Sequence, residues 1–327
     1  MCSEPFVTKI SNSGERTAPP VEPVPAIGVV IPTLNRSDVL QRALLALLQQ
    51  SASHLREIIV VDDGSTDDTE RVVRRMAESD ARIAYLRNSG KGLGRAKFLG
   101  TRLCRAEYIC YLDDDAIAQP SWIEAVASAI GHGASIVQSR LMEPGQQPND
   151  APPARLRWDM WFRTNWVSTC RMENVPFCQE CGVVIRRDIL DSVPFFDPDL
   201  RGTSNQESLS FSLRARAAGY RIAYEPHALV LHVPPGRGGS NDLYPETPDW
   251  KKSSQFAKER YYNTTILQLK FCGWRWPFAV FLNLLRIIPR LARNRSLKFL
   301  CESAVGVLEA LTFAGSKSRQ AVQCAAQ

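Results

Sequence analysis

The stretch Tyr108–Asp115 reads YICYLDDD, an apolar run that ends in three consecutive aspartates. An apolar run of this length predicts a buried strand. Carboxylates clustered at the end of a strand repel one another and lose hydration unless a positive charge lies among them. Mg²⁺ and Mn²⁺ suit such oxygen-rich sites, because they bind through one or two carboxylates plus substrate phosphates. The stretch therefore predicts a metal ion that holds a diphosphate.

Three more strands are predicted upstream of the aspartates, at residues 27–31, 58–61 and 83–86. Each is a short apolar run, and residues with helical spacing follow each of them. Strand, loop and helix repeated at this interval predict an α/β fold, with a mostly parallel sheet and helices on both faces. Ligands bind such sheets beyond the carboxyl ends of the strands. The loops at Pro32, at Asp62–Asp63 and at the aspartates should therefore converge on one crevice.

The composition limits the class of protein. The chain has 327 residues, of which 44% are hydrophobic, enough for one large core or a core with an appendage. Its net charge of +6 resides in the tail, because eight Lys or Arg and two Asp or Glu lie from Phe271 onward. A neutral main body argues against a nucleic-acid partner. Nine scattered cysteines without a secretory signal pattern predict a reducing, cytoplasmic setting.

Three motifs in order carry a family resemblance. They are Val29–Arg36 (VVIPTLNR), Ile58–Asp67 (IIVVDDGSTD) and Tyr111–Asp115 (YLDDD). Together they resemble the family 2 inverting glycosyltransferases of the GT-A fold, over roughly residues 26–235. The resemblance implies a Rossmann-like α/β fold, a nucleotide-diphosphate sugar as donor, and Mn²⁺ or Mg²⁺ as cofactor.

Composition and the resemblance together predict a domain plan. Residues 1–25, rich in Ser, Pro, Glu and Thr, are expected to form a disordered leader. The GT-A domain is expected over 26–240, with a nucleotide-sugar half at about 26–118 and an acceptor half at about 119–240. A basic amphipathic helical tail is expected over 241–327.

The donor site is expected on the loops that follow the first strands. The residues implied by the resemblance are Pro32, Thr33, Asn35, Arg36, Asp62, Asp63, Lys97, Asp113, Asp114 and Arg237. Lys97 and Phe98 stand where the family usually has an Arg-Asn pair, and lysine supplies a charge without the bidentate fork of arginine. The alternative for Asp62–Asp63 is a turn that only caps the next helix, which Asp67 could do alone.

The family's metal-binding DxD corresponds to Asp113 and Asp115. The resemblance implies that Asp115 binds the metal most directly and that Asp113 contacts the ribose, or the metal through water. His232 ends an apolar run at a position where related enzymes place a third metal ligand. A structural histidine is the alternative. The segment Pro234–Gly239 follows, and its Arg237 is a candidate phosphate contact.

The acceptor side is expected at Cys181, Gly182, Gln206 and Glu207. Many family members carry Glu-Asp at a helix start, with one carboxylate as general base, whereas this chain has Glu207-Ser208. Because serine cannot serve as this base at neutral pH, Glu207 is the candidate. The alternative is that Glu207 only stabilises the helix N-terminus through the helix dipole.

Two aromatic groups have two interpretations each. Trp158, Trp161 and Phe162 have the spacing of one buried helix face, or could stack on a sugar or lipid.

In the tail, the ten uncharged residues between Arg275 and Arg286 are too few for a spanning helix, which needs ~20. Their pattern predicts a helix lying in an anionic membrane surface. The alternative is a basic helix packed on the domain or on a second subunit.

The whole sequence predicts a metal-dependent inverting glycosyltransferase that moves a single sugar to a hydroxyl of a glycan, lipid or small metabolite. We expect it in the cytoplasm, peripheral on the inner face of the cell membrane, in polysaccharide, glycolipid or glycosylated-metabolite biosynthesis. A nucleotidyltransferase is one alternative, although those enzymes commonly place a glycine-rich loop after the first strand, and Pro32–Arg36 has no glycine. A non-catalytic nucleotide-sugar-binding module is the other, and Ser208 favours it.

Overall fold

The computed structural model describes residues 25–88, 92–202, 206–233, 253–288 and 297–325. Residues 1–24 of the expected leader lie outside the described residues. So does segment 234–252, which holds Arg237 and the expected boundary between domain and tail.

An eight-stranded sheet forms the centre of the molecule, in the order β3-β2-β1-β4-β9-β6-β10-β5. Its strands are β1 (Ile27–Thr33), β2 (Leu55–Asp62), β3 (Ile83–Arg87), β4 (Tyr108–Tyr111), β5 (Ala116–Ala118), β6 (Ile136–Met142), β9 (Val183–Arg186) and β10 (Ala223–His232). Neighbours are parallel except around β9, which runs antiparallel to β4 and β6, and at β5, which runs antiparallel to β10. The predicted mostly parallel sheet is confirmed.

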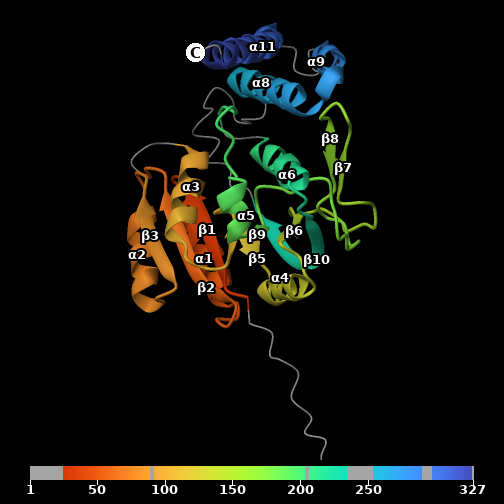
Figure 1. Ribbon diagram of the computed structural model, residues 1–327. Helices are drawn as coiled ribbons and strands as arrows, with labels where there is room; N and C mark the ends of the chain where they lie inside the picture. Colours follow the sequence, from red (N-terminus) through yellow and green to blue (C-terminus); the bar gives the residue numbers. More distant parts are fainter. Residues whose placement is uncertain (1–24, 89–91, 203–205, 234–252, 289–296, 326–327) are drawn as a thin grey trace, which may run out of the picture.

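Helices cover both faces of the sheet, as predicted (Figure 1). Helices α1 (Ser37–Leu48), α2 (Thr69–Ser79) and α4 (Trp122–Gly131) pack on one face, where they share a core with Val29 and Ile31. Helices α3 (Leu93–Leu103) and α6 (Glu207–Ala217) belong to the core of the other face, with Val30; the short α5 (Arg187–Ser192) follows β9. Strand β1 is buried on both faces, which explains its continuous apolar sequence.

Helix α3 lies unusually close to the sheet. A Cβ on Gly100 would lie 2.3 Å from Cγ1 of Val30 and 3.1 Å from Cγ2 of Val61, so only glycine fits there. One turn earlier in α3, Nζ of Lys97 lies 5.8 Å from the centroid of the Tyr111 ring, at the end of β4.

Residues 154–164 form a hairpin of two short strands, β7 (Ala154–Leu156) and β8 (Phe162–Thr164). The buried helix face predicted from Trp158, Trp161 and Phe162 is therefore wrong. Met160 has a positive φ of 61°, and the backbone N–H of Arg157 donates to the carbonyl of Trp161 at 2.7 Å, which closes a turn. Trp158 remains 39% exposed at this turn.

The C-terminal region is helical, as predicted, and packs beyond α6 and the hairpin (Figure 1). It contains α8 (Ser254–Phe271), the 3₁₀ turn η2 (Gly273–Arg275), α9 (Trp276–Leu285) and α11 (Leu297–Ala325). Lys270 of α8 pairs with Asp197 and Asp199 at 2.9 Å each, and Gln206 donates to Oγ1 of Thr264 at 2.7 Å. Among the described helices, none combines the length and apolarity needed to cross a membrane.

Candidate active site

The loop after β1 is fastened to the triple aspartate. Nη1 of Arg36 lies 2.8 Å from Oδ1 of Asp114 and 3.1 Å from Oδ2 of Asp115, and Oγ1 of Thr33 donates to Oδ2 of Asp114 at 2.7 Å. Burial raises the pKa of Asp114 to about 6, although Arg36 opposes this shift. Both oxygens of Asp114 thus accept from protein groups, and its carboxylate joins the end of β4 to the loop after Pro32.

The loop after β2 is held by its own aspartates. Oδ1 of Asp62 accepts from the backbone N–H groups of Gly64 and Ser65, and Oδ2 accepts from the hydroxyl of Tyr85 at 2.7 Å. Asp63 accepts from Nδ2 of Asn88 at 2.8 Å and from the backbone of Gly92. These bonds give both aspartates a role in shaping the loop, and donor contact by either one stays a prediction.

Asn35 and Asp67 connect the first two loops to each other. Asn35 has a positive φ of 53°, and its Oδ1 accepts from the backbone N–H of Thr66 at 2.8 Å. Asp67 accepts from the backbone N–H groups of Ser37 and Thr69, at the starts of α1 and α2. The predicted convergence of these loops at one edge of the sheet is therefore observed. Asp67 accepts these hydrogen bonds at both helix starts, so Asp62 and Asp63 are not needed as helix caps.

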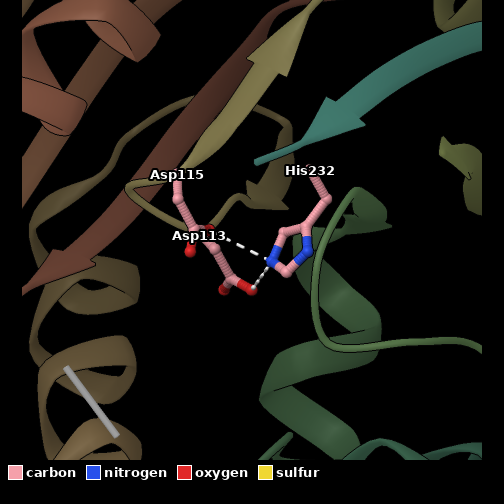
Figure 2. Close-up of side chains that lie close together, drawn as sticks. All are labelled: Asp113, Asp115 and His232. Atoms are coloured by element: carbon pink, nitrogen blue, oxygen red, sulfur yellow. Dashed lines mark ion pairs between the residues drawn. The ribbon is translucent and has the colours of Figure 1, made fainter. Parts of the chain in front are cut away.

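Asp113, Asp115 and His232 form the candidate metal site (Figure 2). Their ligand atoms all lie within 4.8 Å of one another. Nε2 of His232 lies 3.1 Å from Oδ1 of Asp115 and 3.7 Å from Oδ2 of Asp113. The position follows from the sheet, because β5 begins directly after Asp115 and its Ala116 pairs with His232 at the end of β10.

The chemistry of this trio fits a divalent cation. Two carboxylates and one imidazole are acceptable ligands for Mn²⁺ and, less readily, for Mg²⁺. Burial alone would lower the pKa of His232, but hydrogen bonds with Asp113 and Asp115 raise it to about 10. A metal ion at this place would take over the role of that proton in compensating the two carboxylates.

Lys97 lies at the centre of a second group of charges. Its side chain is only 3% exposed, and Nζ lies 2.9 Å from Oε2 of Glu180. Burial opposes its charge, yet Glu180, Asp113 and Glu207 together keep the pKa of Lys97 above its ordinary value. The buried ammonium of Lys97 is thus attracted by three carboxylates, which come from the segment before β9, the end of β4 and the start of α6.

Glu180 was missed by the sequence reasoning. It lies three residues before β9, and because β9 is antiparallel to β4, the start of β9 meets the end of β4. Burial raises the pKa of Glu180, and its bond with Lys97 offsets part of that shift. The only sequence signal was an acidic residue two positions before the short apolar run Gly182–Ile185, and the direction of the strand that this run forms was not visible in the sequence.

The predicted acceptor-side residues lie next to this group. Cys181 is buried, and Gly182, with a φ of 70°, donates its backbone N–H to the carbonyl of Tyr111 at 2.7 Å. Glu207 is the first residue of α6, and its Oε1 lies 3.3 Å from the place that a Cβ on Gly94 would take. The structure therefore brings Glu207 against the first turn of α3, close to Lys97.

Gln206 precedes Glu207 and is 3% exposed. It lines a small pocket together with side chains from the β7–β8 turn and from the C-terminal helices, namely Met160, Trp161, Phe162, Arg260, Tyr261, Thr264 and Asn283. The pocket shows that the C-terminal helices contribute to the surroundings of Gln206.

Comparisons with known proteins agree with this architecture. Residues 28–193 match the model of the Glycosyl transferase family 2. The validoxylamine A glucosyltransferase of Streptomyces hygroscopicus is 39% identical over 109 residues, covering 32% of this chain and 26% of that protein. The glycosyltransferase AglE of Haloferax volcanii is 24% identical over 212 residues, covering 64% and 67% respectively. The segment matched to the chondroitin synthase of Escherichia coli, 36% identical, covers 31% of this chain but 15% of that protein.

Solved structures share the fold. The crystal structure of GalNAc-T7 with UDP, GalNAc and Mn²⁺ aligns with a TM-score of 0.59 and 17% identity, over 73% of this chain and 51% of that one. The fold is thus of the GT-A type. Because the family model spans half of the sequence, the chain belongs to glycosyl transferase family 2.

Proposed function

We propose that this enzyme transfers one sugar from a nucleotide-diphosphate donor to an acceptor hydroxyl, with inversion at the anomeric carbon and with Mn²⁺ or Mg²⁺ bound. The observation that supports the proposal most is the meeting of Asp113, Asp115 and His232 at the same sheet edge as Lys97 and Glu207. Family membership favours glycosyl transfer over the nucleotidyl transfer that the sequence left open.

The donor would lie across the ends of β1, β2 and β4. The loops at Pro32–Arg36 and Asp62–Asp63 would form the floor for base and ribose, since their backbones are fixed by internal hydrogen bonds and need no reordering on binding. GalNAc-T7, which shares the fold, was solved with UDP and Mn²⁺. Which base and which sugar this enzyme takes is decided by side chains around that floor.

The metal ion would be held by Asp115, Asp113 and His232. When bound, it would neutralise charge on the departing diphosphate. His232 must then be neutral at Nε2, so metal binding is expected to release a proton from the pair that His232 forms with Asp115. Arg36 keeps Asp115 oriented from the opposite side, through the 3.1 Å bond to its Oδ2.

Glu207 would take the proton of the acceptor hydroxyl as its oxygen attacks from the face opposite the leaving group. Its buried position requires a nearby positive charge if the carboxylate is to stay ionised, and Lys97 supplies one. Lys97 in turn is held by Glu180 at 2.9 Å. The acceptor is a hydroxyl of a glycan, lipid or small metabolite, and the enzyme works at the cytoplasmic face of a membrane.

A thermal-shift panel of UDP, GDP, TDP and CDP, each with and without Mn²⁺, tests the donor site. A nucleotide at 100 times its Kd should stabilise the folded enzyme by about 2.7 kcal/mol, and only when Mn²⁺ is present. Asp115→Asn should abolish the metal-dependent part. The matched control is Asp188→Asn, which alters an exposed aspartate paired with Arg186 far from the site and should leave the shift intact. If no nucleotide stabilises the enzyme, the proposal is wrong.

A further inference from the structure

The C-terminal helices expose several large apolar side chains on and next to α9. We call this group the apolar face of α9, and define it by Trp274, Phe278, Phe281, Leu285 and Ile288. Trp274 is 85% exposed, and Phe278, Phe281 and Ile288 are each more than half exposed. Large apolar side chains grouped in this way on a protein surface mark a site of interaction, whereas single exposed ones do not.

The opposite side of α9 is firmly packed. Ala279, Val280 and Asn283 are buried, and Nε2 of Gln268 on α8 donates to the carbonyl of Ala279 at 3.1 Å. Arg286 turns inward, where Nη2 lies 2.6 Å from Oδ2 of Asp159. The helix is therefore fixed in its orientation, and the apolar face points outward as a consequence of this packing.

The apolar face is aromatic and extends onto the neighbouring hairpin. The rings of Phe278 and Trp158 are stacked, with centroids 5.9 Å apart and an angle of 6° between their planes. The ring centroids of Phe281 and Phe278 are 6.4 Å apart. Figure 1 shows α9 beside the β7–β8 hairpin, at the end of the molecule formed by the C-terminal helices. Aromatic side chains with this exposure are typical of the boundary between lipid headgroups and acyl chains.

The charge of the segment identifies the partner. From Phe271 to Cys301 the sequence has no Asp or Glu. Besides Arg286, whose charge is paired with Asp159, it has five Lys or Arg: Arg275, Lys298, and Arg290, Arg293 and Arg295, the last three outside the described residues. The guanidinium of Arg275 lies 5.3 Å from the centroid of the Trp274 ring, so a cation accompanies the most exposed aromatic residue. An apolar partner protein would not require this excess of positive charge, whereas an anionic lipid surface attracts it.

We propose that the apolar face of α9 inserts into an anionic membrane surface, with the helix parallel to that surface. Asn283, on the buried side of α9, lines the same pocket as Gln206, the neighbour of Glu207. Insertion therefore holds the acceptor side of the enzyme near the lipid, a consequence that rests on the proposed function; the lipid binding itself does not.

Vesicle co-sedimentation tests the insertion. The full-length enzyme should bind vesicles that contain about 30 mol% phosphatidylglycerol. Its binding to pure phosphatidylcholine vesicles should be at least about tenfold weaker. Salt at about 1 M should weaken the binding to the anionic vesicles. Phe278→Ser combined with Phe281→Ser should reduce the partition constant at least about tenfold. The control is Leu45→Ser combined with Leu103→Ser, which removes two similarly exposed side chains from α1 and α3 and should change the constant less than about twofold.

Three results would overturn the proposal. One is failure of the wild-type enzyme to bind the anionic vesicles, and another is equal binding by the Phe278/Phe281 variant. The third is a wild-type dimer in light scattering that this variant converts to monomers while vesicle binding is unchanged, because the face would then join two subunits. Quenching of wild-type tryptophan fluorescence by brominated anionic lipid needs no variant, and its absence would also contradict insertion of Trp274. Nucleotide-dependent thermal shifts are measured without vesicles, so the two proposals can fail separately.

Discussion

Replacing Arg36 by methionine should reveal how strongly the triple aspartate depends on a cation. Arg36 is 12% exposed, and it pairs with Asp114 and Asp115, whose side chains are 5% exposed each. Removing one partner from a buried ion pair leaves an uncompensated charge, at a cost of ~3–5 kcal/mol. Methionine keeps most of the volume of the arginine stem, so the change in packing should be small.

The lower end of that range is expected for Arg36→Met. Asp114 keeps its 2.7 Å bond from Thr33, and Asp115 keeps its 3.1 Å pair with His232. We therefore expect the free energy of unfolding to fall by ~3 kcal/mol in the presence of a chelator. The control is Arg71→Met, because Arg71 and its partner Asp68, 2.8 Å away, are 68% and 63% exposed, so its loss should leave the free energy of unfolding nearly unchanged.

Urea unfolding followed by circular dichroism measures both variants, with the slope of the transition checked for constancy. Mn²⁺ should return part of the stability lost by Arg36→Met, since a cation near Asp115 replaces the missing charge. Equal stability of the Arg36 and Arg71 variants in chelator would refute the argument from buried charge. A full loss that Mn²⁺ leaves unchanged would show that the metal does not bind near Asp115.

Three further substitutions have clear expectations. Glu207→Gln should lower turnover by ~10²–10⁴ while nucleotide-dependent thermal shifts persist. If Glu180→Gln loses this much turnover and Glu207→Gln does not, Glu180 would be the general base instead of Glu207. The pKa of Asp197 is lowered, because bonds from Ser210 and Lys270 outweigh its burial, so stability should fall as acidification protonates it. Asp197→Asn should flatten the wild-type decline in unfolding free energy below pH ~4, and an unchanged slope would contradict this. Gly100→Ala should cost ~1–3 kcal/mol, because its Cβ would lie 2.3 Å from a valine of β1. Gly315→Ala, in open space on a helix, is the control and should be neutral or stabilising.

The sequence was sufficient for the elements whose pattern is local. Strands β1 and β4 and residues 58–61 of β2 are apolar runs that are buried on both faces, so the sequence predicts them directly. The meeting of the loops after β1, β2 and β4 could also be predicted, since parallel strands carry their exit loops to one edge. The trio of Asp113, Asp115 and His232 required the family resemblance, because His232 follows Asp115 by more than a hundred residues.

The remaining features depend on contacts between distant segments. The position of Glu180 follows from the antiparallel direction of β9, which no property of its own sequence specifies. The hairpin at residues 154–164 has a helix-like spacing of aromatic residues, and its turn at Met160 overrides that spacing. The inward turn of Arg286 was also unpredictable, because Asp159, its partner, lies 127 residues earlier in the chain.

The reversed strand β9 has a consequence for how the family can diversify. Donor-side residues follow their strands, so a change in the length of their loops would move the helix that comes next. Glu180 and Cys181 precede their strand instead, at the end of the long stretch between β6 and β9. That stretch can lengthen, shorten or change composition without altering the register of β1, β2 and β4. If the proposed function holds, relatives could acquire new acceptors through changes in this one stretch, while the loops proposed to hold the nucleotide stay the same.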